Sequence, residues 1–411
     1  MILENKICLL INWPREIDMY NELINSIPEE KIDIIINDLK TFEKERKGNA
    51  LDIKENLLSR NKKFKYFSEI YHKKKYKIIL STGLAHQLKI SLYSVLKFLY
   101  GRTIGHLMDI LGISKIFFKI FNRPFNAGGK YSRIGSYAWY PEKMLAEKSI
   151  RYPTGMDLNL KIYPEKDLER NFDIFFTHSA METNLIKKKF NNKICKIIGY
   201  PRYSKLNDKK KIMNNLKNEF NLDVTKKIIF WTPTHIHYPN ETSKNFIPWI
   251  NKVSELSREY NIIVRPHPKL ITLNSSIKTD LTKKNFFVDN KSDRKIGDLF
   301  KVADLVFCDY GGTLFSSIYL EKPLLLLNMD DNTQFIKELK INLSLDLKLR
   351  NDLINFNIGV NTKEFKNKIS YALDSSYNKK ILHLKKLYFG DEKETLSSDK
   401  IVRFLLNKLS N

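Results

Sequence analysis

The amino-acid sequence predicts an α/β protein in which two Rossmann-like domains face each other across a cleft. Three observations support this fold class. A length of 411 residues is enough for two domains that each bury a core. Short apolar runs typical of buried parallel strands recur along the chain, and segments with helical periodicity separate most of them. The pattern restarts after a charged stretch in the middle of the sequence.

Five apolar runs of strand length lie in the first half of the chain. They are KICLLIN (6–12), KIDIIIN (31–37), KYKIILST (75–82), FDIFFTH (172–178) and KICKIIG (193–199). The charged stretch KLNDKKKIMNNLKNEFNLD (205–223) then predicts a helix and a linker. We therefore expect a first domain over residues 1–205 and a second over residues 206–411.

A second set of five strand candidates follows the linker. These are KKIIFWTP (226–233), YNIIVRPHP (260–268), NFFVD (285–289), ADLVFCDY (303–310) and PLLLLNM (323–329). The segment SDKIVRFLLNKLSN (398–411) has helical spacing and could pack back onto the first domain. Ligands of such paired domains are expected at the carboxyl ends of the strands, in the cleft between the two halves.

The charge balance indicates an affinity for polyanions. Lys and Arg total 71 against 46 for Asp and Glu, a formal net charge of +25. Nucleic acid, anionic lipid or a phosphorylated substrate would fit this charge, and so would a merely well-solvated, Lys-rich surface. A nucleic-acid-binding protein has only the charge in its favour, because no nucleic-acid-binding module is recognisable. We expect no nucleic-acid partner.

The three cysteines are too scattered for a disulfide framework or a zinc cluster. Cys8, Cys195 and Cys308 each lie in an apolar run, where a buried thiol is the usual state. This usage is typical of the reducing cytoplasm.

One region has the composition of a membrane-surface helix. The segment 88–121 is strongly apolar yet carries Lys89, Lys97, Lys115 and Lys119. It lacks 18 consecutive uncharged apolar residues, as does the rest of the sequence, so no membrane-spanning helix is predicted. Two interpretations remain open: a pair of core helices, or a peripheral contact with the anionic inner face of the cell membrane.

The sharpest motif is RPHPKL (265–270), directly after a predicted strand. His267 stands between two prolines that restrict the backbone, and the carboxyl end of a parallel strand would direct it into the cleft. There it could donate to a phosphate or move a proton, with Arg265 as a neighbouring positive charge. A histidine satisfied by local hydrogen bonds in a turn is the alternative.

The motif DYGGTLFSS (309–317) follows another predicted strand and opens a predicted helix. Gly311 and Gly312 would let backbone amides approach a ligand closely, and Thr313 and Ser316 add hydroxyls near the helix N-terminus, which favours anions. The motif is neither the Walker sequence nor the GxGxxG fingerprint, and a plain strand-turn-helix is the alternative.

Two further turns supply candidate ligands for a phosphate. Arg202, in GYPRYSKL (199–206), would reach the cleft at the end of the first domain, although it could equally pair with a structural carboxylate. In WTPTHIHY (231–238), Thr234 and His235 lie on the predicted cleft side. His235 and His237 have no third ligand at a suitable spacing, so we predict neither a metal nor a cofactor.

At these residues the sequence resembles the CDP-glycerol glycerophosphotransferases, which build teichoic acids and related capsule polymers and have the GT-B fold. The likeness runs from about Tyr76 to Met329, through STGLAHQLK, FDIFFTHSAMETNLIKKKF, GYPR, the strand ending in TPT, RPHP and ADLVFCDYGGTLFSSIYLEKPLLLLN. The resemblance implies that His267 acts in the donor site and that the turn Gly311 to Thr313 holds the donor pyrophosphate.

The sequence departs from the family in the first domain. The family has Trp-His-Gly-Thr-Pro there, with the histidine as the proposed base, whereas this chain has Ser81-Thr82-Gly83 and so places Thr82 at the histidine position. His86 follows three residues beyond the glycine and could substitute for that histidine. If neither residue serves, either another group activates the acceptor or the acceptor differs.

The resemblance implies a transferase that moves a glycerol-phosphate-like or sugar unit from a nucleotide-activated donor, CDP-linked in preference, to a lipid-linked or polymer acceptor. A capsule or lipopolysaccharide glycosyltransferase that uses a CMP- or UDP-sugar is an alternative. The Gly-Gly turn with LEKPLLLL also looks like the UDP-sugar 2-epimerases, and similarity at the level of the fold cannot assign the reaction.

Overall fold

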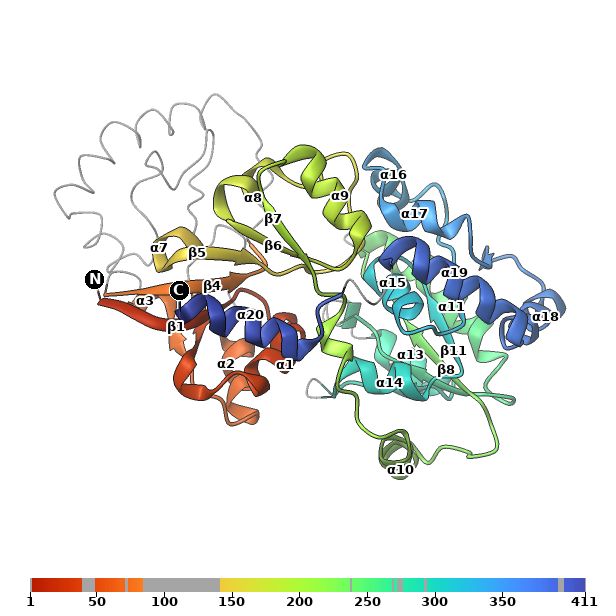
Figure 1. Ribbon diagram of the computed structural model, residues 1–411. Coiled ribbons are helices and arrows are strands. Elements are labelled where there is room, and N and C mark those ends of the chain that lie inside the picture. Colours follow the sequence, from red (N-terminus) through yellow and green to blue (C-terminus); the bar gives the residue numbers. More distant parts are fainter. Residues whose placement is uncertain are drawn as a thin grey trace.

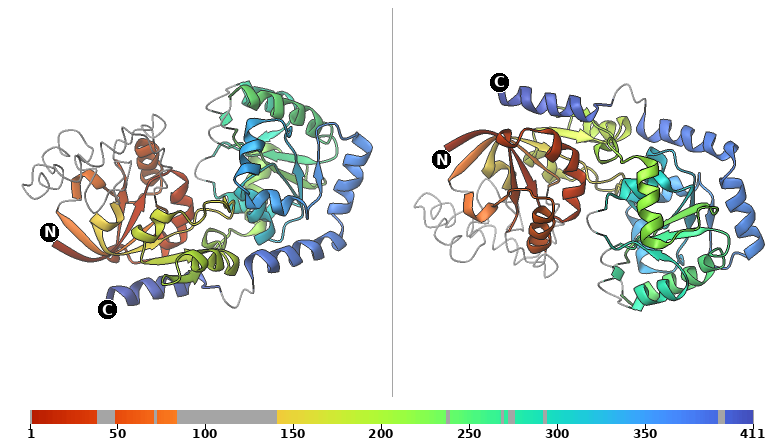
Figure 2. Two further views of the ribbon diagram at one scale, coloured as in Figure 1. Left: turned by 90° about the horizontal axis from the view of Figure 1, so that it is seen from above. Right: turned by 90° about the horizontal axis from the view of Figure 1, so that it is seen from below.

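Two parallel sheets, each covered by helices, form the two halves of the molecule (Figures 1 and 2). The computed structural model describes residues 2–38, 49–70, 73–83, 141–236, 239–267, 270–271, 276–291, 294–390 and 395–410. The first sheet has seven strands and the second has six, and every adjacent pair of strands is parallel.

The first sheet has the strand order β3-β2-β1-β4-β5-β6-β7. Its strands are β1 (Ile2–Ile11), β2 (Ile32–Ile36), β3 (Lys65–Tyr66), β4 (Lys74–Ser81), β5 (Ala146–Arg151), β6 (Ile174–Thr177) and β7 (Ile194–Ile197). The helices of this half are α1 (Arg15–Ser26), η1 (Glu29–Lys31), α2 (Asn49–Ser59), α3 (Phe67–Ile70), α7 (Pro141–Leu145), α8 (Lys166–Asn171) and α9 (Ala180–Lys189).

The second sheet has the strand order β10-β9-β8-β11-β12-β13. Its strands are β8 (Ile228–Thr232), β9 (Asn261–Val264), β10 (Phe287–Val288), β11 (Leu305–Cys308), β12 (Leu324–Leu327) and β13 (Asn355–Phe356). The helices from the connection onward are η4 (Pro201–Tyr203), α10 (Lys209–Phe220), α11 (Pro239–Ser254), α13 (Ser276–Lys283), α14 (Ile296–Val302), α15 (Gly312–Tyr319), α16 (Gln334–Ile341), α17 (Leu345–Arg350), α18 (Thr362–Ala372), α19 (Ser375–Phe389) and α20 (Ser398–Ser410).

Each of the ten apolar runs picked out from the sequence overlaps a strand, and β1 and β4 begin before their runs do. Three further strands, β3, β5 and β13, were not predicted. β3 and β13 have two residues each and carry too little pattern to detect. β5 reads AEKSIR, and its exposed Glu147 and Lys148 interrupt the apolar run that a buried parallel strand usually shows.

Helix α20 lies against the first domain, beside α1 (Figure 1). Its buried residues Ile401, Leu405 and Leu409 join the core that the odd-numbered residues of β1 form on one face of the sheet. The Nζ atom of Lys77 on β4 donates to the carbonyl oxygen of Leu409 at 2.9 Å. The chain therefore returns from the second domain to complete the core of the first.

Among the described helices, none combines the length and the apolarity that a bilayer crossing requires. The apolar segment 88–121 lies outside the described residues, so its two interpretations stay open.

The packing of α20 can be tested with Leu405→Ala. Leu405 is fully buried, so the cavity should lower the free energy of unfolding of the first domain by about 2–5 kcal/mol, measured by urea denaturation. Asn407→Ala, at an exposed position of the same helix, is the control and should change stability by less than about 0.5 kcal/mol. Equal effects of the two substitutions would contradict the packing described above.

Candidate functional site

Each sheet has one point at which the strand order reverses. In the first sheet the chain leaves β1 in one direction and β4 in the other, and in the second sheet β8 and β11 have this relation. Loops diverge at such a point, so a crevice opens beyond the carboxyl ends of the two strands, and ligands of open α/β sheets bind there. The turns after β8 and β11 carry most of the predicted donor residues.

A buried carboxylate joins the turns after β8 and β11. Asp309, directly after β11, accepts hydrogen bonds from Nε1 of Trp231 at 3.3 Å and from the backbone N–H of Thr234 at 3.1 Å. Burial raises the pKa of Asp309 to about 7, although these two hydrogen bonds and the charge of Arg350 act in the opposite direction. The carboxylate thereby fixes the backbone at Thr234.

Arg350, at the end of α17, supports the carboxyl edge of the second sheet after β11 and β12. Its guanidinium donates to the carbonyl oxygen of Asp309 and to the side-chain oxygen of Asn328, and it lies 3.9 Å from the ring centroid of Tyr310. A bidentate guanidinium holds two neighbouring strand ends in a fixed geometry. The turn that leads into α15 therefore starts from a rigid support.

The structure brings together the two histidine turns, which lie about 30 residues apart in the sequence. The rings of His235 and His267 are stacked, with centroids 5.6 Å apart and an interplanar angle of 23°. His235 is buried and His267 is exposed. The backbone N–H of His267 donates to the carbonyl oxygen of Pro233 at 3.1 Å, which joins the turn after β9 to the turn after β8. His267 thus presents its side chain at the reversal point of the second sheet.

The glycine turn occupies the other side of this point. Gly311 has a φ of 89°, a left-handed conformation that favours glycine, and helix α15 begins at the next residue. The backbone N–H of Gly311 already donates to Asp346 at 2.9 Å. An incoming anion would therefore have to use the amides of Gly312 and Thr313, where the helix dipole also favours negative charge.

Arg202 and Ser316 meet where the two domains join. Nη2 of Arg202 donates to Oγ of Ser316 at 3.3 Å, and Ser316 donates in turn to the carbonyl oxygen of Gly312 at 3.2 Å. The guanidinium also lies over the rings of Tyr200 and Tyr203, at 5.3 and 4.8 Å. Arg202 is thus held beside the first turn of α15, with Ser316 as a bridge between them.

Arg265 is engaged behind the histidine turn. Its guanidinium donates to Asp289 at 3.1 Å and to the backbone carbonyl oxygens of Arg294 and Lys291 at 2.9 and 3.2 Å. These contacts tie the turn after β9 to the loop after β10. A direct contact of Arg265 with a phosphate remains a prediction.

Asp157 is an acidic group that the sequence analysis missed. A Cβ atom on Gly312 would lie 3.2 Å from its Oδ1 atom, so the first domain reaches the N-terminus of α15 at this residue. The side chain is exposed, yet the protein around it raises its pKa by desolvation, and the charge of Asp346 adds to the effect. Arg15 and His178 act in the opposite direction.

Thr82 stands at the reversal point of the first sheet. Its hydroxyl donates to Oε1 of Glu16, which follows β1 and lies in the first turn of α1, at 2.5 Å. Next to it, the hydroxyl of Ser81 donates to Glu142 at 2.6 Å. His86 and His237, two histidines considered above, lie outside the described residues.

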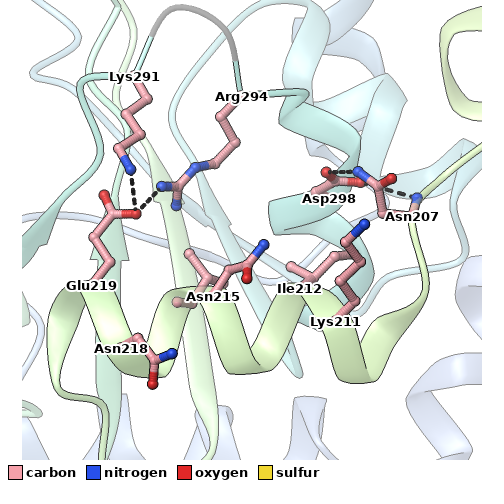
Figure 3. Close-up of a pocket in the computed structure, with 10 residues that line it drawn as sticks. Asn207, Lys211, Ile212, Asn215, Asn218, Glu219, Lys291, Arg294 and Asp298 are labelled. Atoms are coloured by element: carbon pink, nitrogen blue, oxygen red, sulfur yellow. Dashed lines mark hydrogen bonds and ion pairs between the residues drawn. The ribbon is translucent and has the colours of Figure 1, made fainter.

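A separate cavity of about 600 Å³ lies along α10, and none of the predicted site residues is among those that line it. Its charged lining is largely paired internally: Glu219 accepts from Lys291 and Arg294, and Asp298 accepts from Asn207 (Figure 3). These pairs fasten the linker helix to the second domain.

In the part of the chain that the structure describes, no group of three or more His, Cys, Asp and Glu side chains is arranged to hold a metal ion.

Three features of the site were not predicted from the sequence: Asp309, Asp157 and the contact between Glu16 and Thr82. Asp309 could have been chosen because a polar residue at the end of a buried strand lies at the ligand-binding edge. Asp157 lies in a segment without periodicity, and the contact between Glu16 and Thr82 joins positions 66 residues apart. No local pattern marks either one.

Comparison with known proteins places this geometry in context. Residues 153–407 match the family described as CDP-Glycerol:Poly(glycerophosphate) glycerophosphotransferase. The teichoic acid glycerol-phosphate primase of Bacillus spizizenii is 26% identical over 184 residues, 42% of this chain and 46% of that protein. The teichoic acid glycerol-phosphate transferase of Staphylococcus aureus is 25% identical over 192 residues, 44% of this chain and 45% of that protein. The chain matches less than half the length of these two relatives.

Solved structures show the same fold. The wall teichoic acid polymerase TagF superposes with a TM-score of 0.56 at 13% identity, covering 99% of this chain and 90% of that one. The UDP-GlcNAc 2-epimerase from Neisseria meningitidis, bound to UDP-GlcNAc, gives a TM-score of 0.51 at 13% identity over 98% of this chain and 100% of that one. The predicted GT-B-like fold of two parallel α/β domains is confirmed.

The buried state of Asp309 predicts a pH dependence of stability. Because its pKa is about 7 in the folded protein and about 3.9 in an unfolded chain, only the folded state binds the proton between these values. The stabilisation from this proton is complete below the unfolded pKa and is lost as the pH rises through about 7. Lowering the pH from about 8 to about 5.5 should therefore add about 2 kcal/mol to the free energy of unfolding through this group.

In Asp309→Asn this contribution should disappear. Urea denaturation at several pH values across that range gives the free energy of unfolding as a function of pH. The slope of this dependence should differ between the variant and the wild type, because other titrating groups affect both proteins alike. Identical slopes would show that Asp309 is ionised throughout.

Proposed function

The chain belongs to the CDP-glycerol:poly(glycerophosphate) glycerophosphotransferase family, and from this premise we propose that it transfers a glycerol-phosphate-type unit from a CDP-activated donor. The acceptor would be a growing teichoic-acid-like polymer or its lipid-linked primer. One observation carries the proposal: inside the family-matched segment, His267 stacks on His235 in the turn after β8, and Asp309, two residues before Gly311, accepts a hydrogen bond from Thr234 of that turn.

The chemistry of the transfer suits these groups. An acceptor hydroxyl attacks the phosphorus that carries the glycerol, the bond from this phosphorus to the bridging oxygen breaks, and CMP leaves with the electron pair. Negative charge spreads over the phosphoryl oxygens, so catalysis depends on positioned cations and hydrogen-bond donors. The amides of Gly312 and Thr313, the ring of His267 and the guanidinium of Arg202 supply such donors around one location.

The relatives support the choice of donor. The first two are a glycerol-phosphate primase and a glycerol-phosphate transferase of teichoic acid, and one TagF structure was determined after a soak with CDPG. A sugar-nucleotide transferase or an epimerase would share the fold but would turn over a UDP- or CMP-sugar. A panel of CDP-glycerol, CDP-ribitol, CMP-sugars and UDP-sugars, assayed for nucleotide release with and without a lipid-linked acceptor, separates these functions. Turnover of a sugar nucleotide alone would overturn the proposal.

His267→Ala should lower CMP release from CDP-glycerol by at least about 100-fold, because one hydrogen-bond donor or proton carrier at the phosphoryl group would be lost. The side chain is exposed, so the urea midpoint should stay near that of the wild type. His383→Ala, at an exposed histidine of α19, is the matched control and should retain activity. A near-normal rate in His267→Ala would remove this residue from the mechanism.

A location at the inner face of the cell membrane completes the proposal. The apolar, Lys-rich segment 88–121 would bring the enzyme to the surface on which a lipid-linked acceptor resides, by burying apolar side chains between headgroups and attracting anionic lipid. The support for this location is the sequence of the segment alone.

Vesicle sedimentation tests this location. The wild type should bind vesicles that contain phosphatidylglycerol and should bind less as the salt concentration rises. Replacing Lys89, Lys97, Lys115 and Lys119 with Gln should release it, whereas replacing four exposed lysines of the second domain, Lys209, Lys210, Lys217 and Lys227, should have little effect. A wild type that never binds such vesicles would disprove the membrane contact.

A further inference from the structure

The first domain has a polar cluster at its own reversal point, between the carboxyl ends of β1 and β4. We define the β1–β4 cluster as Asn12, Glu16, Ser81, Thr82 and Glu142. All five residues are buried. Thr82 retains 6% of its solvent exposure, whereas Glu16 retains none. Five buried polar side chains at a ligand-binding edge call for an explanation beyond packing.

One branch of the cluster is a hydroxyl–carboxylate pair. Oγ1 of Thr82 donates to Oε1 of Glu16 at 2.5 Å, and the backbone N–H of Asn12 donates to Oε2 of Glu16 at 2.7 Å. The hydroxyl proton of Thr82 thus points at the carboxylate, so the oxygen lone pairs are directed elsewhere. A second hydroxyl group that approached Thr82 would act as a donor to it.

The other branch holds this pair in place. Ser81 donates to Glu142 at 2.6 Å and accepts from the side chain of Asn12 at 3.4 Å and from the backbone N–H of Gly83 at 3.1 Å. Asn171 donates to Glu142 at 3.0 Å. The carboxylate of Glu142 is therefore satisfied within the scaffold and does not reach Thr82.

The hydroxyl of Tyr20 is a further buried polar group beside the cluster, because the charges of Glu16 and Glu142 act on it. This side chain lies one turn beyond Glu16 on α1 and is 0% exposed, and its oxygen has no hydrogen-bond partner within the described ranges. The charge of Glu16 adds to the burial that raises the pKa of Tyr20. Leaving a buried hydroxyl unpaired costs about 1–3 kcal/mol, so such a group often belongs to a functional site.

The cluster lies on the side of the first domain that faces the donor residues. Arg15, the neighbour of Glu16, interacts electrostatically with Asp157, and Asp157 lies against the N-terminus of α15 at Gly312. Helix α1 also packs against η4, which carries Arg202. The turn after β1 is thus adjacent to the proposed donor site.

A second turn in the same domain has the same hydrogen bond from a backbone N–H to a glutamate four residues later, and so serves as a comparison for Glu16. After β6, the backbone N–H of His178 donates to Oε2 of Glu182 at 2.7 Å, four residues on, as Asn12 does to Glu16. Burial would raise the pKa of Glu182, but His178 and Arg151 lower it to about 2. Around Glu16 the hydrogen bonds come from uncharged groups, and burial raises the pKa to about 7. The turn itself therefore does not require a carboxylate that can accept a proton near neutral pH.

We propose that Thr82 and Glu16 form a proton-transfer pair that activates the acceptor hydroxyl. The acceptor hydroxyl gives its proton to Oγ1 of Thr82 while Thr82 gives its own proton to Oε1 of Glu16. The acceptor oxygen forms its bond to phosphorus, CMP leaves with the electron pair, and the proton on Glu16 returns to solvent after release. This inference rests on the transfer reaction proposed above, and it assigns the acceptor a free hydroxyl group as the reacting function.

The test compares isosteric variants in the full-length protein. Glu16→Gln and Thr82→Val should each lower kcat for CMP release in the presence of acceptor by about 100-fold or more, because general-base assistance contributes about 10² to 10⁴. Thr82→Ser keeps the hydroxyl and should retain most of the activity. Glu147→Gln, at an exposed position of β5 outside the cluster, is the control and should retain activity.

The pH profile separates proton transfer from a purely structural role. The wild-type kcat should rise with pH through about 7 as Glu16 ionises, the exposed-site variant Glu147→Gln should keep this rise, and Glu16→Gln should lose it. Arg15 acts electrostatically on Glu16, and Glu16 acts on Tyr20, which in turn feels Tyr152, Glu142 and Cys8. Protection of each variant against thermal unfolding by CDP-glycerol should stay within about 2-fold in apparent Kd, because the donor binds the other domain.

The outcomes divide clearly. A Glu16→Gln variant with the wild-type kcat and pH profile would overturn the proton-transfer pair and leave the transferase proposal intact, as would a Thr82→Val variant with normal kcat. Equal loss of donor protection in both variants would make the cluster structural and would also overturn the pair. A wild type that neither binds CDP-glycerol nor releases CMP would overturn the proposed function and this inference with it.

Discussion

The two passages of the chain between the domains are the constraint on which the rest of the molecule depends. The first runs from Gly199 through η4, and the second leads from α19 to α20. They are tied together by the hydrogen bond from Leu396 N–H to the carbonyl oxygen of Ile197 at 2.8 Å and by the contact of the Ser204 and Ser398 hydroxyls at 2.6 Å. These contacts fasten the two passages to each other at the end of β7. A site composed of groups from both sheets needs such a constraint.

Packing at the first passage leaves little freedom. The ring of Tyr200 lies 4.2 Å from that of His178 and 5.1 Å from that of Tyr319, so the junction is a continuous aromatic core. Gly199 has a φ of 58°, and a Cβ atom there would lie 2.6 Å from the hydroxyl of Tyr319. Arg202 emerges from this core beside α15. The packing of the junction thus sets the position of Arg202. The buried carboxylates of Asp309 and Glu16 act in a similar way, because each accepts a backbone N–H and so fixes a turn at the reversal point of its sheet.

Much of the fold was accessible from the sequence because buried parallel strands leave continuous apolar runs. The link between the RPHP turn and the turn after β8 was accessible as well, since both turns follow strands and the carboxyl ends of parallel strands share an edge. The detailed roles were not. Arg265 stands beside His267 in the sequence, yet its guanidinium turns to Asp289, a residue 24 positions away. Hydrogen bonds between distant positions leave no periodic signal, and only the folded chain reveals them. Examples are the bonds that Gly311 N–H donates to Asp346 and that the Thr82 hydroxyl donates to Glu16.

The return of α20 to the first domain sets an order for folding during synthesis. The α20 side chains that pack in the core with Ile7, Leu9 and Ile11 leave the ribosome roughly 200 residues after β7 does. The sheet of the second domain is complete by then, whereas the sheet made first still lacks α20, which covers its face together with α1 and α2. Domains usually finish folding in the order in which they are made. Here the half that is synthesised first completes its core last, when α20 arrives.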